Sequence, residues 1–176
     1  GSCVMASLNW IGHAGMQTLR RHTPLAIHGH RNGYGAWSRH PLLGMSIPAY
    51  QTLWRLAGVD HPHVHGVQGK FAQPDSEVIE GINDCYQPLA GDAADVAMPI
   101  ISSGQRAGTV PATFAAAQSD AAVFMSVGGV LAHPDGAAPG VASIRQACAA
   151  TVAGKATVID PDIPPEIPRA MAFLGP

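Results

Sequence analysis

The chain has 176 residues, a formal net charge of −2 and a charged share of only 12%. A single domain of this length buries about two-thirds of the surface that its unfolded chain exposes, and a charged share below the usual ~25% predicts a buried parallel sheet or a piece of a larger assembly. Because no basic block is present, the sequence excludes the electrostatic footprint of a nucleic-acid or membrane-surface binder, and a small molecule or another subunit is the expected partner.

Short apolar runs of strand length alternate with stretches of helical period along the chain. The predicted strands are, in order, Cys3–Leu8, Leu25–His30, His61–Gly66, Val96–Ser102 and Ala121–Val127. Strand–helix alternation requires right-handed crossovers and a parallel sheet, so the predicted fold class is α/β. Because no repeat or linker divides the chain, we expect one domain over residues 1–176.

Stretches of helical period predict six helices around these strands. The first helix is centred on Met16 and Leu19. The next three begin at Ser46, Ser76 and Thr109, the last of these with Pro111 in its first turn. The fifth spans Ala138–Ala153, and a short final helix covers Arg169–Leu174. The apolar stripes expected to be buried on three of them are Ile47, Tyr50, Leu53, Trp54 and Ala57; Val78, Ile82, Cys85, Tyr86 and Leu89; and Val141, Ile144, Cys148 and Val152.

The cysteines and the first residues bear on the cell compartment. Cys3, Cys85 and Cys148 are odd in number, far apart and outside any CxxC pair, so we expect reduced, mostly buried thiols. The opening GSCVMASLNW lacks the basic flank and apolar stretch of a secretion signal, and no window has the ~18 apolar residues that span a bilayer. These observations predict a soluble, cytoplasmic protein.

Two strand ends are rich in histidine, in the segments LAIHGHR and DHPHVHGVQGK. Because strand side chains alternate, His28 and His30 share one face, and so do His61, His63 and His65. A single strand histidine is more often a hydrogen-bonded core or rim residue, but the clustering predicts two convergent rows of imidazoles. Such rows are typical of an enzyme that holds a phosphorylated, oxygen-rich substrate.

Further motifs at the carboxyl ends of the strands suit an anion, and ligands of barrels and doubly wound sheets bind at these ends. The Arg31 guanidinium can form two parallel hydrogen bonds to a phosphate, although a rim salt bridge is its simpler role. Lys70, in a glycine-rich loop, can close over a substrate or remain merely solvated. Ser102 with Gly104, and the pair Gly128–Gly129, can present backbone amides to a phosphate or form ordinary turns.

The HxH patterns also fit a zinc site, with His28, His30, His61 and His63 as ligands. A magnesium site needs oxygen ligands, and Asp60 and Asp135 are the only acids near these motifs. The chain alone therefore does not predict a magnesium site.

The segments HGHR, DHPHVHGVQGK, PIISSGQ and VGGVLAHPDGAAPG resemble, in the same order, the carboxyl-terminal part of the RuBisCO large chain, and most closely the non-carboxylating (type IV) RuBisCO-like proteins. The resemblance covers Cys3 to about Ala150. It implies that residues 1–176 are the carboxyl-terminal portion, about strands 4–8, of a TIM (β/α)₈ barrel. The first barrel strands and an amino-terminal α+β domain are then expected outside this chain. The same resemblance implies a homodimer, or a multiple of it, that needs the remainder of the barrel.

The resemblance also implies roles for individual residues. The residues that it assigns are His30 and Lys70 as catalytic groups, Arg31, His63 and Ser102 as ligands of a phosphate and hydroxyls, and Gly104, Gly128 and Gly129 as a backbone site for a second phosphate. His133 and Pro134 match a structural pair. The Mg²⁺ cofactor and a catalytic lysine are expected in the missing part of the barrel.

Departures from the carboxylase motifs point to the reaction. The chain reads HRNGYGAWSR and GKFAQPD where carboxylases read HRAMHAVIDR and GKLEGE, so Tyr34 replaces a histidine and the acidic loop partner is absent. We therefore expect a lyase or isomerase that acts on a phosphorylated keto-sugar or keto-sugar acid through a Mg²⁺-stabilised enediolate, without CO₂ fixation. The alternatives are a zinc-dependent hydrolase and a catalytically silent sugar-phosphate-binding homologue.

Overall fold

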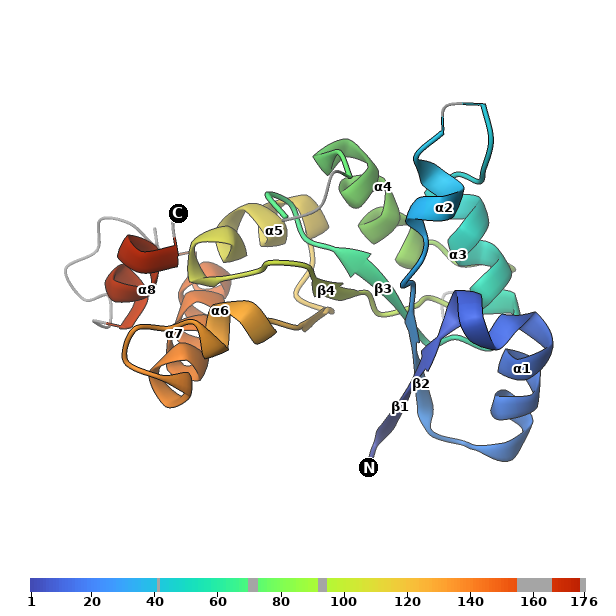
Figure 1. Cartoon of the computed structure of the whole chain (residues 1–176), viewed down its shortest axis with the longest axis horizontal. Coiled ribbons are helices and arrows are strands. Elements are labelled where there is room, and N and C mark those ends of the chain that lie inside the picture. The colour runs from blue at the N-terminus through green and yellow to red at the C-terminus, as the bar shows by residue number, and fades with distance from the viewer. Residues whose placement is uncertain (41, 70–72, 92–94, 155–165, 175–176) are drawn as a thin grey trace. The chain divides into compact units, whose positions relative to one another are not determined.

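The computed structural model describes residues 1–40, 42–69, 73–91, 95–154 and 166–174. These residues form an α/β structure (Figure 1). Its strands are β1 (Cys3–Ser7), β2 (Ala26–His30), β3 (His61–His65), β4 (Ile100–Ser102) and β5 (Val123–Phe124). The helices are α1 (Leu8–His22), α2 (Gly35–Ser38), α3 (Ile47–Leu56), α4 (Asp75–Cys85), the 3₁₀ turn η1 (Ala107–Thr109), α5 (Val110–Ala117), α6 (Val127–Leu131), α7 (Ala137–Val152) and α8 (Glu166–Leu174).

The strands follow one another in the sheet in chain order, β1-β2-β3-β4-β5. Strands β1 and β2 run parallel with Cys3 opposite Ala26, and β2 and β3 run parallel with His28 opposite His61. The predicted parallel sheet is therefore confirmed. The register also matters for function, because it places the histidines of two neighbouring strands side by side.

The first three strands agree with the prediction to within a residue at each end, whereas the last two are shorter than predicted. The backbone N–H of Ala97 donates to the carbonyl of Cys85 at the end of α4, so the chain joins the sheet only at Ile100. Val127, predicted to end the last strand, begins α6 instead. An ordinary turn, one of the two alternatives considered for the pair Gly128–Gly129, is wrong, because both residues lie within that helix.

The predicted helix starts have mixed outcomes. The Ser46 hydroxyl accepts the Ala49 N–H at 3.5 Å, which confirms the cap of α3. The cap at Ser76 was wrong, because α4 already begins at Asp75, whose carboxylate accepts the Gln68 N–H at 3.0 Å. Thr109 directly precedes α5 as expected, but its hydroxyl makes no cap hydrogen bond to that helix.

Three residues of the predicted apolar stripes are exposed instead of buried. The exposed fractions are 41% for Leu53, 44% for Val141 and 58% for Val152. Helix α7 instead buries Gly140, Ser143, Ile144 and Ala147, because it packs against α5, α6 and α8 through its small residues. Ile144 is buried as predicted, so apolar periodicity alone located only part of the buried face of this helix.

The described chain divides into two compact units, which we treat separately. Unit 1 comprises Gly1–Val64, Ser76–Ile100 and Ala121–Val123, and unit 2 comprises His65–Asp75, Ile101–Asp120 and Phe124–Pro176. In unit 1, α1 and α3 lie on the same side of β1 and β2 (Figure 1) and share one apolar core. Buried residues of this core include Met16, Ile27, Tyr50 and Trp54. The core of unit 2 joins η1, α5, α7 and α8 through Val110, Ile144, Ala147 and Ile167.

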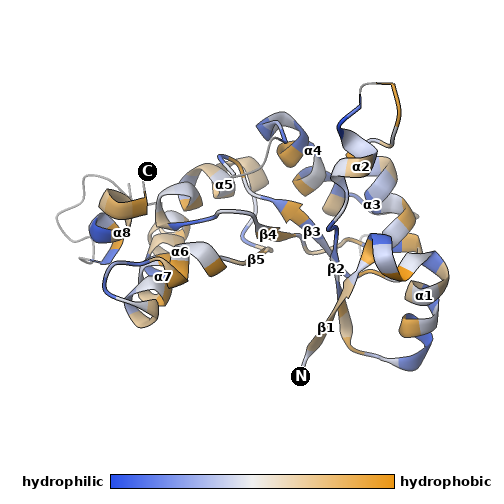
Figure 2. Ribbon diagram, in the orientation of Figure 1, coloured by the Kyte–Doolittle hydropathy of each residue, from blue (hydrophilic) through white to orange (hydrophobic). Residues whose placement is uncertain are grey.

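Several apolar side chains are exposed. The loop between α2 and α3 carries a hydrophobic segment (Figure 2), in which Leu42 is 85% and Leu43 69% exposed. All three cysteines are free thiols, but only Cys85 is fully buried, and Cys3 is exposed, contrary to the expectation. Among the described residues, no helix has the length and apolar character needed to cross a membrane.

Candidate active site

Three imidazoles gather on β2 and β3 in unit 1, those of His28 and His63 in mid-strand and that of His30 at the carboxyl end of β2. His28 Nε2 lies 3.0 Å from His63 Nδ1, within hydrogen-bond distance, and the two ring planes are nearly parallel, 7° apart. The His30 ring meets His63 edge-on, with 4.5 Å between ring centroids. The predicted convergence of the imidazole rows is thus confirmed for these three residues. The cause is the parallel register together with strand alternation.

His28 is the electrostatically distinctive member of this cluster. It is 4% exposed, and burial, followed by the neighbouring His30 and His61, lowers its pKa from 6.5 to about 4. Desolvation disfavours the charged imidazolium, and nearby imidazoles that can be charged act in the same direction. His28 is therefore neutral at pH 7 and takes part in its hydrogen bond as a neutral ring.

The orientation of His30 is set by the backbone. Its Nδ1 accepts the Asn32 N–H at 3.2 Å, so the neutral ring carries its proton on Nε2. His30 is half-buried at the end of β2. Its Nε2–H is then a fixed donor, the type of group that stabilises negative charge developing on an oxygen.

Arg31 directly follows this cluster and is 5% exposed. Its guanidinium carbon lies 5.0 Å from the centroid of the Tyr34 ring, a cation–π contact. Burial lowers the pKa of Arg31 to about 10, with Tyr34 and Tyr50 opposing the shift, so the group is still a cation at neutral pH. The Tyr34 hydroxyl donates to the carbonyl of Met45. Tyr34, the departure noted above, thus orients the arginine against a fixed ring.

In unit 2, Ser102, Ser103 and Gly104 lie at the end of β4 and in the loop that follows it. Ser102 ends β4, is 6% exposed, and its hydroxyl lies 3.2 Å from that of Ser103. Ser103 and Gly104 both have left-handed backbones, with φ of 72° and 86°. The conformation suits glycine but strains a serine, and such strain clusters at functional sites. Sequence analysis missed Ser103, because a positive φ leaves no signal in a serine-rich motif.

The two glycines of α6 differ in their surroundings. A Cβ added at Gly128 would meet nothing within 4 Å, so its backbone is open to approach. A Cβ at Gly129 would lie 2.6 Å from the carbonyl oxygen of Gln105 and 3.1 Å from Arg106 Cα. Gly129 is therefore required for packing, whereas Gly128 is the one suited to an anion.

Gln105 connects three loops of unit 2 and was also missed. It is 1% exposed, its Nε2 donates to the Val67 carbonyl at 3.3 Å, and its Oε1 accepts from the hydroxyls of Thr109 and Thr113 at 3.0 and 2.9 Å. Its own carbonyl accepts from the Ser126 hydroxyl. The four-residue spacing of Gln105, Thr109 and Thr113 is a sequence signal that could have pointed to this network.

Two further predicted positions belong to unit 2. Lys70 lies outside the described residues, so its catalytic role is not tested here. His133 is 4% exposed, its Nδ1 accepts the Asp135 N–H at 3.1 Å and its Nε2 lies 3.3 Å from the Glu166 carbonyl. These contacts tie the loop after α6 to α8, which agrees with the structural role expected for this residue.

Residues 1–173 match the family model for the ribulose bisphosphate carboxylase large chain, catalytic domain. The chain belongs to the RuBisCO large-chain family. A RuBisCO-like protein from Burkholderia fungorum, known from its crystal structure, is 61% identical, with a TM-score of 0.93 over 98% of this chain and 43% of that chain. A dimeric archaeal Rubisco from Hyperthermus butylicus is 30% identical, with a TM-score of 0.80 over 99% of this chain and 44% of that chain. These matches confirm the predicted fold class, the carboxyl-terminal portion of the RuBisCO barrel.

Two curated relatives carry names of reactions. A 3-oxo-isoapionate-4-phosphate transcarboxylase/hydrolase from Xanthobacter autotrophicus is 40% identical over 98% of this chain and 42% of that protein. A 3-oxo-isoapionate-4-phosphate decarboxylase from Rhizobium etli is 37% identical over 88% of this chain and 37% of that protein. The chain spans about two fifths of the length of such relatives. Both proteins are named for 3-oxo-isoapionate 4-phosphate, and neither is named as a ribulose bisphosphate carboxylase.

The residues that the structure describes do not form a magnesium site. In the part of the chain that the structure describes, no three His, Cys, Asp or Glu side chains are arranged to hold a metal. The two acids considered above are engaged elsewhere: Asp60 pairs with Arg20 at 2.6 Å, and Asp135 with Arg169 at 2.8 Å. The zinc hypothesis likewise finds no ligand set among these residues, because His28 and His63 point their ring nitrogens at each other.

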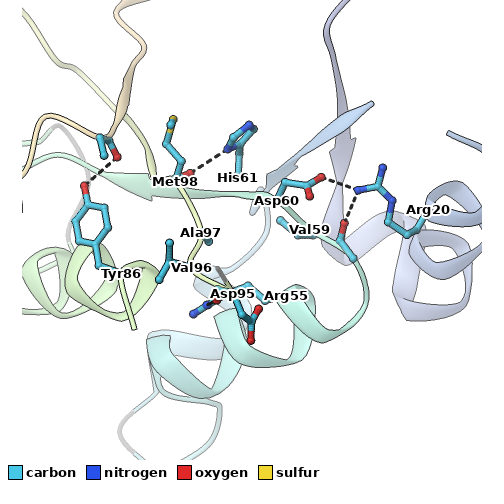
Figure 3. A pocket seen from close by; sticks show the side chains of 12 residues that line it. Arg20, Arg55, Val59, Asp60, His61, Tyr86, Asp95, Val96, Ala97 and Met98 are labelled. Atoms are coloured by element: carbon cyan, nitrogen blue, oxygen red, sulfur yellow. Dashed lines mark hydrogen bonds and ion pairs between the residues drawn. The ribbon is translucent and has the colours of Figure 1, made fainter. Parts of the chain in front are cut away.

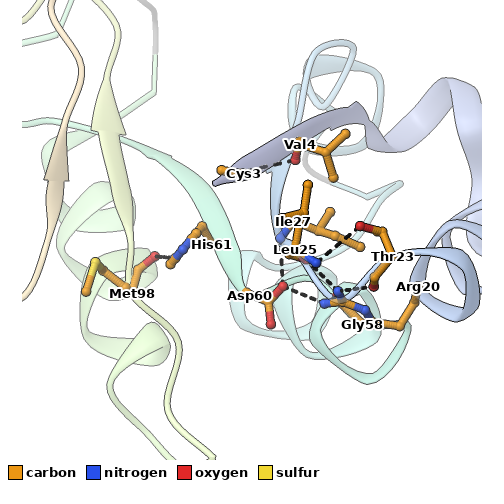
Figure 4. Close-up of polar contacts among 10 residues, drawn as sticks. All are labelled: Cys3, Val4, Arg20, Thr23, Leu25, Ile27, Gly58, Asp60, His61 and Met98. Carbon is orange, nitrogen blue, oxygen red and sulfur yellow. Dashed lines mark hydrogen bonds and ion pairs between the residues drawn. The ribbon is translucent and has the colours of Figure 1, made fainter. Parts of the chain in front are cut away.

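Asp60 has a structural role at the opposite ends of the strands. Its carboxylate accepts from Arg20 and from the Ile27 N–H at 2.7 Å (Figure 4). Arg20 also donates to the carbonyls of Gly58, Thr23 and Leu25, shown in the same view. This network fastens the end of α1 to the beginnings of β2 and β3.

A cavity of about 500 Å³ lies beside this network in unit 1, at the amino-terminal end of β3 (Figure 3). Its lining includes Arg20, Arg55, Asp60, His61 and Tyr86. Arg20 pairs with Asp60, and the Arg55 guanidinium donates to three backbone carbonyls, those of Asp84, Gln87 and Asp95. The cations of this cavity serve the fold, and the imidazole cluster is the better candidate for chemistry.

Proposed function

We propose that this chain contributes to a RuBisCO-like enzyme that acts on a phosphorylated keto-sugar or keto-sugar acid. The reaction is a decarboxylation, enolisation or isomerisation through an enediolate, without CO₂ fixation. The observation that carries the proposal is membership of the family together with 40% and 37% identity to two enzymes named for 3-oxo-isoapionate 4-phosphate. The clustered imidazoles and the buried guanidinium of unit 1 support it chemically.

The chemistry asks for stabilisation of one developing oxyanion. When a 3-oxo acid loses CO₂, the bond between the carboxylate carbon and its neighbour breaks, and the electron pair moves onto the ketone oxygen. A proton then returns to the carbon. His30 offers its Nε2–H to such an oxygen, because its Nδ1 is held by the Asn32 N–H. We assign His30 as the catalytic residue of unit 1.

Phosphate binding is the second requirement. In unit 1 we assign Arg31 and His63, a buried cation and a buried imidazole, to a phosphate group. In unit 2 we assign Ser102 and the backbones of Gly104, Gly128 and Gly129; of the two α6 glycines, Gly128 is the more open. Lys70 is proposed as a catalytic cation that faces the substrate.

Magnesium and the oligomer are further parts of the proposal. We expect the Mg²⁺ ligands in the preceding part of the barrel, because the described residues supply none. We also expect a homodimer or a multiple of it, in line with the dimeric archaeal Rubisco. The expected compartment is the cytoplasm.

The test is an assay of the full-length protein with 3-oxo-isoapionate 4-phosphate and a panel of phosphorylated ketoses, with Mg²⁺ added. We expect CO₂ release or substrate proton exchange in D₂O. The variant His30→Phe should lower kcat about 100-fold, because it removes one preorganised donor, whereas His22→Phe, an exposed imidazole of α1, should not change it. Absence of turnover with every substrate contradicts the proposal.

The same preparation separates the alternatives. Tight binding of a sugar phosphate without turnover indicates the catalytically silent homologue. Stoichiometric zinc that is lost in His28→Phe and His30→Phe indicates the hydrolase.

A further inference from the structure

The contact between His28 and His63 joins two buried imidazoles through one ring nitrogen of each. His28 Nε2 and His63 Nδ1 are 3.0 Å apart, and the exposed fractions of the two residues are 4% and 7%. Two buried polar rings are costly to desolvate unless their hydrogen bond is made. A phenylalanine at position 28 would fill similar space without that cost, so filling the core does not explain this pair.

A neutral imidazole can act either as donor or as acceptor at Nε2. If His28 donates from Nε2, then His63 Nδ1 accepts and the proton of a neutral His63 lies on its Nε2. If His63 is charged, its Nδ1–H donates and His28 accepts after its own proton has moved to Nδ1. In these two states His63 presents an N–H at Nε2 to a phosphate oxygen, whereas a neutral His63 that donated from Nδ1 would leave Nε2 without a hydrogen.

We propose that His28 is a positioning residue that donates from its Nε2 to His63 Nδ1, and thereby fixes the ring orientation of His63 and keeps the proton of neutral His63 on Nε2, where it is a donor to the substrate phosphate. The proposal rests on the proposed function in one respect, the assignment of His63 to a phosphate. It adds a residue that touches no substrate and acts only through His63.

The surroundings of the pair suit this role. His30 of β2 faces both rings, with centroids 6.0 Å from His28 and 4.5 Å from His63, and His61 is the next titratable group along β3 on the same face. His65 is the following one on that strand. Burial, followed by His30 and His61, lowers the pKa of His28 to about 4, so His28 remains an uncharged partner at neutral pH.

The test compares two substitutions in the full-length protein. His28→Gln places an amide close to the position of Nε2, and it can donate or accept after a flip of the amide. His28→Phe keeps the ring shape but has no hydrogen-bonding atom. The probe is inorganic phosphate, titrated by calorimetry at pH 6, 7 and 8, together with KM and kcat for the phosphorylated substrate.

We expect His28→Phe to weaken phosphate binding and raise KM about tenfold, with a smaller effect on kcat, and to change the pH dependence of phosphate binding. His28→Gln should stay within about threefold of wild type, with the wild-type pH dependence. The matched control is His13→Phe, because His13 also makes a parallel ring contact, with Trp54, but lies outside the cluster. It should bind phosphate like wild type.

Equal behaviour of the Phe and Gln variants overturns the proposal, and so does a wild-type protein that binds no phosphate. If His28→Phe does not fold, His28→Asn replaces it, since its shorter amide does not reach His63. Failure of the proposed function looks different: no substrate turns over, while phosphate binding still distinguishes the Phe and Gln variants.

Discussion

The two units of this chain arrange the polar groups that we propose for phosphate binding in different ways. Unit 1 places imidazoles on regular strands, where parallel register and alternation bring His28, His30 and His63 together. Unit 2 uses irregular loops, with left-handed backbone at Ser103 and Gly104. A site on strands can be recognised from residue spacing, whereas a site in loops depends on backbone path and on distant partners.

The units also differ in the hydrogen bonding of a buried glutamine side chain. Gln105 of unit 2 has partners at both ends of its amide. Gln51 of unit 1 is 4% exposed and donates to the Gly81 carbonyl, but its Oε1 has no hydrogen-bond partner among the described residues. Satisfied and unsatisfied polar groups contribute very differently to stability, so this contrast can be tested directly.

The largest effect is expected from the glycines of α6 in the full-length protein. Gly129→Ala should lower the free energy of unfolding by about 3 kcal/mol, because its Cβ would lie 2.6 Å from a backbone carbonyl that cannot move away cheaply. Gly128→Ala, with nothing within 4 Å, should leave stability within about 0.5 kcal/mol of wild type. Denaturant unfolding measures both, and equal stability of the two variants contradicts the packing difference.

An intermediate effect is expected from the two glutamines. Gln105→Met should cost about 2–3 kcal/mol, because the Thr113 hydroxyl and the Val67 carbonyl lose their partner in a buried place. Gln51→Met should cost about 1 kcal/mol or less, since it also removes an unsatisfied oxygen. Thermal and denaturant unfolding of the two variants provide the comparison. A larger loss in Gln51→Met would show that the hydrogen bonds of unit 1 dominate.

The third effect is absent at pH 7, grows as the pH falls, and is expected in unit 1. Because the pKa of His28 is about 4 in the folded chain and 6.5 when unperturbed, the unfolded state binds the extra proton first as pH falls. The contribution of neutral His28 to the free energy of unfolding is therefore fully present above pH 6.5 and is lost between pH 6.5 and 4. The loss is at most about 3 kcal/mol, and it is smaller if local opening admits water to the ring.

Unfolding free energies of wild type and His28→Gln, measured from pH 7 to 4.5, test this. The two curves should converge toward low pH, because the variant has no imidazole at this position to protonate. Curves that stay parallel show that His28 is not held neutral by the fold.

Local sequence pattern accounts for the first three strands and for the start of α3. Both signals, alternation with a period of two and a serine before an apolar stripe, are properties of neighbouring residues. They can therefore be recognised without knowledge of the fold. The predicted stripe of α7 failed at Val141 and Val152, because three neighbouring helices, not apolar periodicity, selected its small-residue face. The cap predicted at Ser76 failed by one residue for a similar reason, since Asp75 is tied to a loop seven residues earlier.

The sequence by itself determined the family, the parallel α/β class and the meeting of the β2 and β3 histidines, because motif order, strand period and register are encoded along the chain. Only the tertiary structure decided that Arg31 is buried against Tyr34, that Gly129 is a packing residue and that Gln105 joins three loops. Gln105 and Val67 are 38 residues apart, and a hydrogen bond across such a separation exists only once the backbone has folded. Functional groups that depend on long-range partners can therefore be identified only from the tertiary structure, whereas groups brought together by strand alternation can be predicted from the sequence.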